Sequence, residues 1–341
     1  MDISIIIPVY KVEKYVKYCV ESVISQTYKG EVECIIVNDC TPDRSMEIIE
    51  DVISTYQGNI QFKILHHEKN EGIAVVRNTG LKAATGKYII QVDSDDYFEA
   101  DMLNKMYHKA ELEDADIVVA DYYLDSLAGS VYRKQTLPIE KVEMIRRLIW
   151  NTSPYEHFDI TLSNKLIQRK LYINNDIYCY PNIDYGEDLL TVLRVIWVAS
   201  KIVYINEAFY HYVKYNPNSC CNTISLKNII GRMEANKMIE RFIEEKKIEC
   251  DWELSLKKIS DKAYILFSTS GDLQRQYCSL YKETNKYIST YCRNSNYRTY
   301  WKFAYRLGLR GNLFLFNLMR GIWRLLKNRK EQLICMADIE K

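Results

Sequence analysis

Apolar residues alternate between strand-like runs and helix-like spacing over the first hundred residues. Residues 3–9 form a continuous apolar run of strand length, and apolar positions from Val12 to Ile24 then recur at the i, i+3, i+4 spacing of an amphipathic helix. The same succession repeats, with further strands expected at 33–38, 61–65 and 88–92 and further helices at 41–56 and 74–84. Strands that are apolar on both faces and separated by helices predict a doubly wound, mainly parallel α/β sheet.

The pattern becomes less regular after residue 100 and helical towards the end. It predicts one more strand at 116–121, a loop or hairpin at 126–135 and a polar loop at 151–158. Glu187-Asp188 opens a helix after Gly186, and helical spacing dominates from about Leu226. We therefore expect an α/β domain over residues 1–225 and a helical region over residues 226–341.

Polar groups follow three of the first four predicted strands. They are Pro8-Val9-Tyr10, Asn38-Asp39 and Asp93-Ser94-Asp95-Asp96. In open α/β sheets, ligands bind beyond the carboxyl ends of the parallel strands. These residues are therefore expected to share one edge of the sheet and to form a ligand site.

The segment Asp93–Asp96 carries the sharpest chemical signal. Carboxylates two residues apart at the end of a strand can hold a hard divalent ion through oxygen, and the ion can offset the charge of a bound diphosphate. The alternative is an acidic turn that only ends the strand. An EF-hand is excluded because the required glycine and distal glutamate are missing.

Two further acidic positions have both a structural and a functional interpretation. Asp39 by itself is typical of a helix cap, but the acidic segment expected at the same sheet edge favours a ligand contact. Acids in the first turn of a helix complement its dipole, which explains Glu187 and Asp188 without any function. Alternatively, Asp188 is a general base that the helix N-terminus keeps ionised.

Composition and absent motifs exclude several classes of protein. The chain has 341 residues, of which 48% are hydrophobic and 27% charged, as in ordinary soluble globular proteins. No GxGxxG, GxxxxGK[ST] or GxSxG motif is present, so the fingerprints of dinucleotide-binding proteins, P-loop proteins and serine hydrolases are missing. Ten cysteines without a CxxC pair, no basic leader and no apolar run near the ~20 residues of a membrane span predict a cytoplasmic location.

Several ordered motifs resemble family 2 glycosyltransferases with the GT-A fold. The resemblance is dense over residues 1–125, in SIIIPVYKVEKYVKYCVESVISQTY, IIVNDCTPDRS and NEGIAVVRNTGLKAATGKYIIQVDSDDYF. It continues more sparsely in SNKLIQRKLY, GEDLLTVLRV and YHYVKYNPNS. The resemblance implies a nucleotide-binding half at 1–100 and an acceptor half at 101–225.

The family implies a role for each matching residue. Asp93 and Asp95 would form the DxD pair that binds Mn²⁺ or Mg²⁺, with Asp95 the direct ligand, and Asp188 would be the catalytic base. The remaining positions would bind the nucleotide sugar: Pro8, Val9, Tyr10, Asp39, Arg77, Asp93 and Ser94.

The resemblance also implies a reaction, namely inverting transfer of one sugar from a nucleotide donor, with UDP favoured, to an acceptor hydroxyl. A lipid-linked glycan of a bacterial capsule or O-antigen is the expected acceptor. Two departures qualify this. Asn38 stands where the family often has a first aspartate, so the role of that aspartate does not carry over to Asn38. The QxxRW motif of processive synthases is absent, which favours single addition.

The C-terminal region is basic, with nine Lys or Arg and no acid between Tyr297 and Lys330. Interleaved aromatic residues are typical of a helix on an anionic membrane surface, which would make the enzyme peripheral on the inner face of the membrane. The alternative is a basic helix packed on the acidic body of the protein, and the apolar side is interrupted by Gly308 and Gly311. Nucleic-acid binding is not expected, because the other basic residues are not clustered.

Two other functions are compatible with this architecture. A sugar-nucleotide pyrophosphorylase shares the architecture, but its glycine-rich N-terminal loop is missing from SIIIPVYK. A non-catalytic scaffold docked at the membrane would have no need of Asp39, Asp93, Asp95 and Asp188 together.

Overall fold

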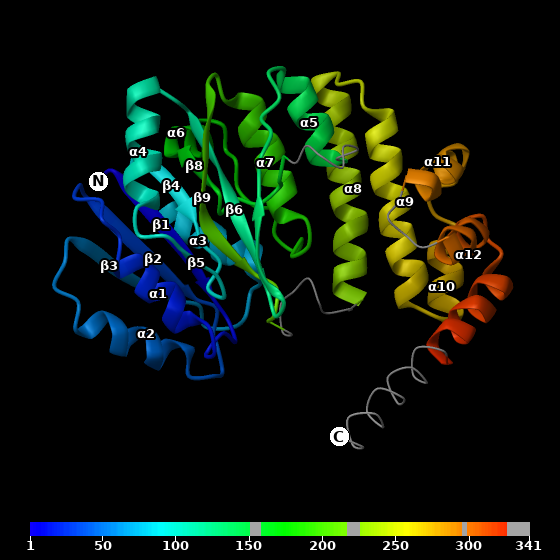
Figure 1. The fold of residues 1–341 in the computed structure, drawn as a ribbon, viewed down its shortest axis with the longest axis horizontal. Helices are drawn as coiled ribbons and strands as arrows, with labels where there is room; N and C mark the ends of the chain where they lie inside the picture. The colour runs from blue at the N-terminus through cyan, green and yellow to red at the C-terminus, as the bar shows by residue number, and fades with distance from the viewer. Residues whose placement is uncertain (151–157, 217–225, 295–298, 326–341) are drawn as a thin grey trace. The chain divides into compact units, whose positions relative to one another are not determined.

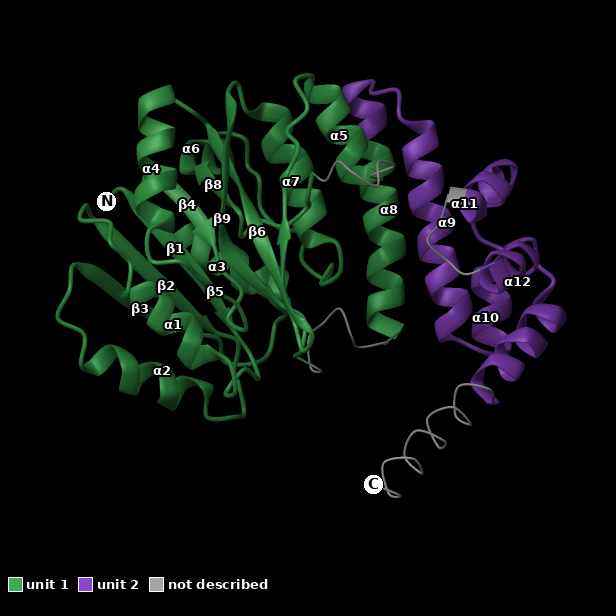
Figure 2. Ribbon diagram, viewed as in Figure 1, with its two compact units in different colours: residues 1–242 green, residues 243–341 purple. Residues whose placement is uncertain are grey.

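The computed structural model describes residues 1–150, 158–216, 226–294 and 299–325. The chain forms two compact units, residues 1–242 and residues 243–341 (Figure 2). The boundary predicted at residue 225 falls at the end of a stretch outside the described residues, so it stays a prediction. The polar loop predicted at 151–158 also lies outside them, apart from Phe158.

Four parallel strands form one half of the central sheet (Figure 1). They are β1 (Ile3–Val9), β2 (Val32–Asn38), β3 (Ile60–His66) and β4 (Tyr88–Gln91). Their spatial order is β3-β2-β1-β4, so β1 pairs with strands on both sides and the order reverses there. Such a reversal opens a crevice at the carboxyl ends of the strands, which is where ligands bind in sheets of this kind.

The other half of the sheet is mixed and continues β4-β8-β6-β9-β5. These strands are β5 (Tyr97–Phe98), β6 (Ile117–Ser126), β8 (Lys165–Gln168) and β9 (Ile202–Val213). β8 is antiparallel to β4 and β6, whereas β9 is parallel to β6. β7 (Gly129–Arg133) pairs with β6, which confirms a hairpin in the segment where a loop or hairpin was predicted.

Helices cover both faces of the parallel half. Ile5 and Ile7 of β1 lie in a core shared with α1 (Val16–Ile24), α2 (Ser45–Ser54) and α4 (Met102–Glu113). Ile6 points to the opposite face, where α3 (Ile73–Ala83) packs. A Cβ at Gly80 of α3 would lie 2.4 Å from Cγ2 of Ile6, so the missing side chain lets this helix approach the sheet closely.

Two predicted helix starts differ from the structure. The first helix begins at Val16 and not at Val12, and α2 begins at Ser45 and not near Thr41-Pro42. The reason for the second is that Oδ1 of Asp43 accepts hydrogen bonds from the Thr41 hydroxyl and from the N–H and hydroxyl of Ser45. These side-chain contacts hold residues 41–45 in a turn that precedes the helix.

Three helices accompany the mixed half of the sheet, namely α5 (Lys141–Ile149), α6 (Arg169–Asn174) and α7 (Glu187–Val198). The long helix α8 (Leu226–Lys246) contains the boundary between the two units. The second unit contains α9 (Asp251–Ser268), α10 (Gly271–Cys278), the 3-10 helix η2 (Lys282–Tyr287), α11 (Ile288–Asn294), α12 (Thr299–Leu309) and a helix at 313–325. The expected α/β class with a helical C-terminal region is confirmed.

Candidate active site

Three segments meet at the edge of the sheet where β1, β2 and β4 end. Tyr10 follows β1, Asp39 follows β2, and residues 93–96, here called the acidic loop, follow β4. The N–H of Asp39 donates to the carbonyl of Val9, which ties the end of β2 to that of β1. The prediction that these polar segments share one edge is confirmed.

Arg77 of α3 links the acidic loop to the start of α7. Its Nη1 donates to Oε1 of Gln91 and its Nη2 donates to Oδ1 of Asp93, each at a distance of 2.9 Å. The same Nη2 lies 3.3 Å from Oδ1 of Asp188, and Nε lies 3.9 Å from Oε1 of Glu187. Because this buried guanidinium is surrounded by groups from β4, the acidic loop and α7, it fixes where Asp93 and Asp188 lie relative to each other.

Burial and ion pairing compete in setting the charges of this cluster. Burial by itself lowers the pKa of Arg77, but Asp188, Asp93 and Glu187 outweigh burial and raise that pKa. Burial raises the pKa of Asp188 to about 6, against the lowering effect of Arg77. The helix N-terminus alone predicts a low pKa for Asp188, so the structure reverses the direction of the shift. The carboxylate is nonetheless mostly ionised at neutral pH.

The three carboxylates of the acidic loop have different surroundings. Asp93 is bound by Arg77, and Oδ2 of Asp95 accepts a hydrogen bond of 2.8 Å from Nδ2 of Asn216. Burial, and then repulsion from Asp93, raise the pKa of Asp95 to about 6. Asp96 is fully buried and accepts hydrogen bonds from the main chain of Val213 and from a tyrosine of β9. Asp93 and Asp95 therefore remain the two partly accessible carboxylates of this loop.

The donor set suits a divalent cation that shares its ligands with a phosphate. Mg²⁺ and Mn²⁺ prefer oxygen donors, and Mg²⁺ is commonly held by one or two carboxylates together with phosphate oxygens and water. Asp93 and Asp95 supply such carboxylates, and repulsion from Asp93 disfavours the charged form of Asp95. Among the described residues, no group of three His, Cys, Asp or Glu side chains is placed to hold an ion by itself.

Tyr210 of β9 supports the acidic loop from below. Its hydroxyl donates to Oδ2 of Asp96 over 2.6 Å and accepts from the N–H of Asp93 over 3.1 Å. Tyr210 and Asn216 lie in the segment YHYVKYNPNS, which resembles the family, but no physical signal in the sequence singled out either residue. Their roles depend on contacts with residues more than 100 positions away along the chain.

Asp39 organises the start of α3. Its Oδ1 contacts Nδ1 of His67 and accepts a hydrogen bond from the N–H of Glu71, each at a distance of 2.9 Å. Its Oδ2 accepts from Nδ2 of Asn70 over 2.8 Å and from the N–H of Gly72 over 2.9 Å. The carboxylate is buried and shapes the loop that leads into the helix bearing Arg77.

Lys165 is a buried cation that acts electrostatically on Asp188. Its Nζ donates to the carbonyls of Asp159 (2.8 Å) and Thr161 (2.6 Å) and to Oδ1 of Asn164 (2.8 Å). Burial lowers the pKa of Lys165 to about 8, and Lys165 in turn lowers the pKa of Asp188. In the sequence, Lys165 lies within the motif SNKLIQRKLY, which gives it no role.

The remaining predicted contacts differ in accessibility. Pro8, Val9 and Ser94 are buried, and only Tyr10 among the predicted nucleotide contacts of β1 is exposed. Tyr10 directly follows β1, and its ring is exposed. The roles assigned to all these residues stay proposals.

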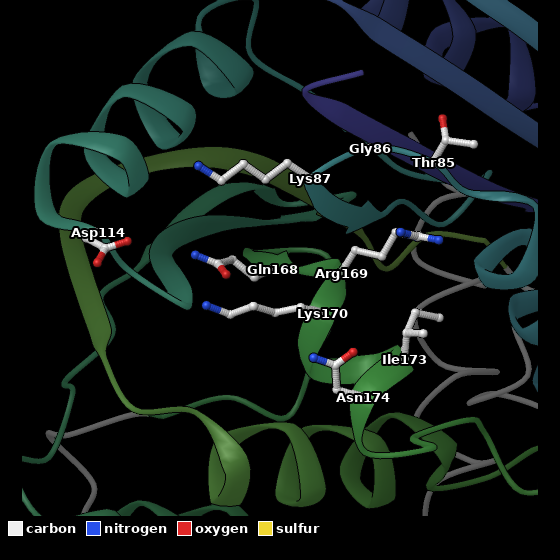
Figure 3. Close-up of a pocket in the computed structure, with 9 residues that line it drawn as sticks. All are labelled: Thr85, Gly86, Lys87, Asp114, Gln168, Arg169, Lys170, Ile173 and Asn174. Atoms are coloured by element: carbon white, nitrogen blue, oxygen red, sulfur yellow. The ribbon is translucent and has the colours of Figure 1, made fainter.

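A cavity of about 410 Å³ lies elsewhere, at the start of β4 (Figure 3). In Figure 3, the side chains of Lys87, Gln168 and Lys170 point towards the side on which Asp114 lies. The side chain of Arg169 points in the opposite direction. None of the residues predicted for the site lines this cavity. The acidic loop and the cavity lie at opposite ends of β4, and the residues predicted for the site are at its carboxyl end.

The sequence matches the family model described as Glycosyl transferase family 2 over residues 4–175, half of the chain. The chain belongs to this family. Glycosyltransferase GlyG of Streptococcus pneumoniae is 34% identical over 221 residues, which are 62% of this chain and 70% of GlyG. Several other curated family 2 relatives are matched over less than two thirds of their own length.

Solved structures share the fold of this family 2 member. TarS residues 1–349 of S. aureus in complex with UDP-GlcNAc superposes with a TM-score of 0.58 at 19% identity and covers 95% of this chain and 92% of TarS 1–349. Mannosyltransferase PcManGT of Pyrobaculum calidifontis, in complex with GDP-Man and Mn²⁺, gives 0.51 at 12% identity, with 92% and 86% covered. The expected GT-A fold is confirmed, and the chain is a glycosyltransferase.

Proposed function

We propose that this chain transfers a single sugar, with inversion, from a nucleotide-sugar donor to an acceptor hydroxyl. A hexosyl or N-acetylhexosaminyl group is the proposed cargo and a UDP-sugar the favoured donor, supported by the UDP-GlcNAc bound to TarS, which has the same fold. The observation that carries the proposal is the buried arginine that joins the acidic loop to Asp188. It holds the carboxylate for the donor phosphates and the carboxylate for the acceptor in one cluster.

The proposed reaction is a single displacement at the anomeric carbon. Asp188 accepts the proton of the acceptor hydroxyl while the acceptor oxygen forms its bond to that carbon. The bond from the anomeric carbon to the phosphate oxygen breaks on the opposite face, and the nucleoside diphosphate leaves with the electron pair. One proton moves to Asp188 and no covalent enzyme intermediate forms.

Asp95, with Asp93, is proposed to hold Mn²⁺ or Mg²⁺. When bound, the ion neutralises charge that develops on the departing diphosphate. Tyr10, together with Pro8 and Val9 at the end of β1, is proposed to contact the base, while Asp39 shapes the loop beside it. Ser94 and Arg77 complete the proposed donor side, with Arg77 acting through Asp93.

The proposed acceptor is a glycan, carried by a lipid in capsule or O-antigen synthesis. The alternative function is a scaffold that keeps the fold without catalysis and docks at the membrane. Only nucleoside-diphosphate release from a nucleotide sugar separates these two, because a scaffold can retain binding.

Catalysis is tested by release of nucleoside diphosphate from UDP-GlcNAc, and the binding site by thermal unfolding of the full chain with UDP, GDP or dTDP, each with and without Mn²⁺. A ligand at 100 times its dissociation constant stabilises the native state by about 2.7 kcal/mol, which is several degrees for a unit of this size. We expect a shift with UDP that requires Mn²⁺ and is lost in Asp95→Asn. Asp114→Asn is the matched control, because it removes the same charge from an exposed carboxylate.

A metal-independent shift, or one retained in Asp95→Asn, would reject the assignment of the acidic loop. A shift with GDP or dTDP alone would replace UDP as the donor nucleotide. No shift with any nucleotide, together with no release of nucleoside diphosphate from UDP-GlcNAc, would leave the scaffold as the function.

A further inference from the structure

The helix at 313–325 in the second unit turns an apolar side outward. Phe314 and Leu325 are 77% and 68% exposed, and Leu318 and Ile322 are also exposed. Residues 314, 318 and 322 are four apart and 325 follows three later, so their side chains share one side of the helix. Leu315 extends that side. Single exposed apolar residues are ordinary, but a continuous helical stripe of them is a feature of interaction surfaces.

The opposite side of this helix is attached to the second unit through polar groups. Nη1 of Arg320 donates to the carbonyls of Phe267 (2.9 Å) and Thr269 (2.6 Å) at the end of α9. Asn317 and Gln274 exchange hydrogen bonds through their side-chain amides. Since buried contacts fix this side, the outward direction of the apolar stripe follows from the fold of the unit itself.

The two glycines that interrupt the sequence pattern explain how the stripe is segregated. Gly311 has a φ of +96° and lies in the turn that separates α12 from the helix at 313–325. A Cβ at Gly308 would lie 2.5 Å from Leu266 and 2.9 Å from Phe316, so its absence allows close packing. The basic and apolar positions that the sequence places on one interrupted helix thus belong to two helices with separate exposed sides.

The charge around the stripe identifies its partner. Residues 284–330 contain eleven Lys or Arg and no Asp or Glu. Arg310, which precedes the stripe in sequence, and Arg324, which lies between Ile322 and Leu325, are exposed. A second copy of the chain would place this basic region against itself, whereas an anionic lipid surface complements both its charge and its apolar stripe.

We propose that the helix at 313–325 lies in the interface of an anionic membrane, with Phe314, Leu318, Ile322 and Leu325 among the acyl chains. Arg310 and Arg324 then contact lipid phosphates. This surface docks the enzyme without spanning the bilayer, and no helix among the described residues is long and apolar enough to span it. The inference is independent of the sugar, the donor and the reaction proposed above.

The test is co-sedimentation of the full chain with vesicles of phosphatidylcholine alone or mixed with phosphatidylglycerol. We expect binding to the anionic vesicles that weakens as salt is added. The variant Phe314→Ser/Leu318→Ser/Leu325→Ser should bind about tenfold or more weakly, since it removes the apolar area that enters the lipid. Arg310→Gln/Arg324→Gln should weaken binding about fivefold for each base that contacts the surface.

The matched control is Leu112→Ser/Leu127→Ser/Ile139→Ser, which removes three apolar side chains of the first unit that are more exposed than those of the stripe. It should bind vesicles like the unaltered chain. All these side chains are exposed, so unchanged thermal unfolding verifies that each variant folds.

Three results would overturn the proposal. They are no binding of the unaltered chain to anionic vesicles, equal binding by the apolar-stripe variant, and a dimer in sedimentation velocity that only this variant abolishes. The last result would assign the stripe to a second copy of the chain.

Discussion

Asp188 has a pKa of about 6 because burial raises it while Arg77 opposes the rise. A general base works only when ionised, so the protonated form that dominates below this pKa is inactive. We expect kcat/KM to rise with pH through about 6 and to level off above neutral pH. The measurement is a pH profile of nucleoside-diphosphate release from the nucleotide sugar that binds, with acceptor present.

Replacing this base tests the assignment at the same scale. Asp188→Asn should lower kcat by about 100-fold or more, the usual contribution of general-base catalysis, and should make the acidic limb of the profile shallower, leaving the part due to Asp95, whose pKa is also about 6. Asp114→Asn should leave both unchanged. A full rate in Asp188→Asn would show that another group takes the proton.

Tyr210 is expected to matter through the acidic loop and not through the reacting atoms. Tyr210→Phe leaves the buried Asp96 without its hydroxyl donor and removes the acceptor of the Asp93 N–H. The loss of such a buried partner costs about 1 to 3 kcal/mol of unfolding free energy. Urea unfolding should show this loss, and the Mn²⁺ concentration needed for half-maximal activity should rise.

Tyr18→Phe removes a hydroxyl from a side chain that is 65% exposed, and it should change neither quantity. A stable Tyr210→Phe protein with unaltered Mn²⁺ dependence would mean that the hydroxyl does not position the loop.

The carboxylates of the site could be found from the sequence, but which of them are accessible and which are buried could not. Position after a strand identified Asp39 and the acidic loop, since strand ends share an edge. Whether Asp95 is accessible and Asp96 buried depends on β9, which lies more than 100 residues away. The same distance hides the link that Arg77 makes to Asp188, because no periodicity relates α3 to α7.

At the scale of elements, the packing of α3 on β1 depends on Gly80. A methyl group there would meet Cγ2 of Ile6 at 2.4 Å, and this atom is attached at the branched Cβ and cannot swing away. Gly80→Ala should therefore destabilise the first unit by about 1 to 3 kcal/mol, despite the better helix propensity of alanine. Because Arg77 is on the same helix, kcat should fall as well.

Gly231→Ala is the matched control, since its nearest neighbour would lie at an ordinary 3.7 Å. That substitution should stabilise the helix by about 0.5 to 1 kcal/mol. Equal unfolding midpoints in urea for the two variants would show that α3 can shift away from the sheet at no cost.

The start of the parallel half could be predicted because β1 and β2 are buried apolar runs of seven residues, each followed by a helix of clear periodicity. The mixed half could not be predicted in full. β5 has two residues and β8 has four, too few for a pattern, and each is defined by pairing with strands distant in sequence. Local hydrogen bonds from Asp43 likewise moved the start of α2 beyond what residue preferences indicate.

At the scale of the whole molecule, a net charge of +1 conceals a strong separation of charge. Residues 284–330 carry eleven bases and no acid, while the rest of the chain carries 35 bases and 45 acids. The sequence alone reveals this separation, but it cannot show which bases are free. The structure assigns Arg320 to the carbonyls at the end of α9, so this base belongs to the fold of the second unit itself.

The separation of charge has a consequence for the intact protein near pH 7.5, its isoelectric point from sequence. At its isoelectric point, a protein whose positive and negative charges are evenly spread does not bind an ion exchanger. A concentrated basic region, in contrast, binds a sulfonate resin through its local electric field. We expect retention at low salt and release once the Debye length falls to about 10 Å, near 0.1 M salt. Arg310→Gln/Arg324→Gln should elute earlier than Lys29→Gln/Lys63→Gln, although both pairs remove two exposed positive charges. Identical elution of the two variants would show that retention follows net charge alone. The basic region would then produce no local positive field that could attract an anionic membrane.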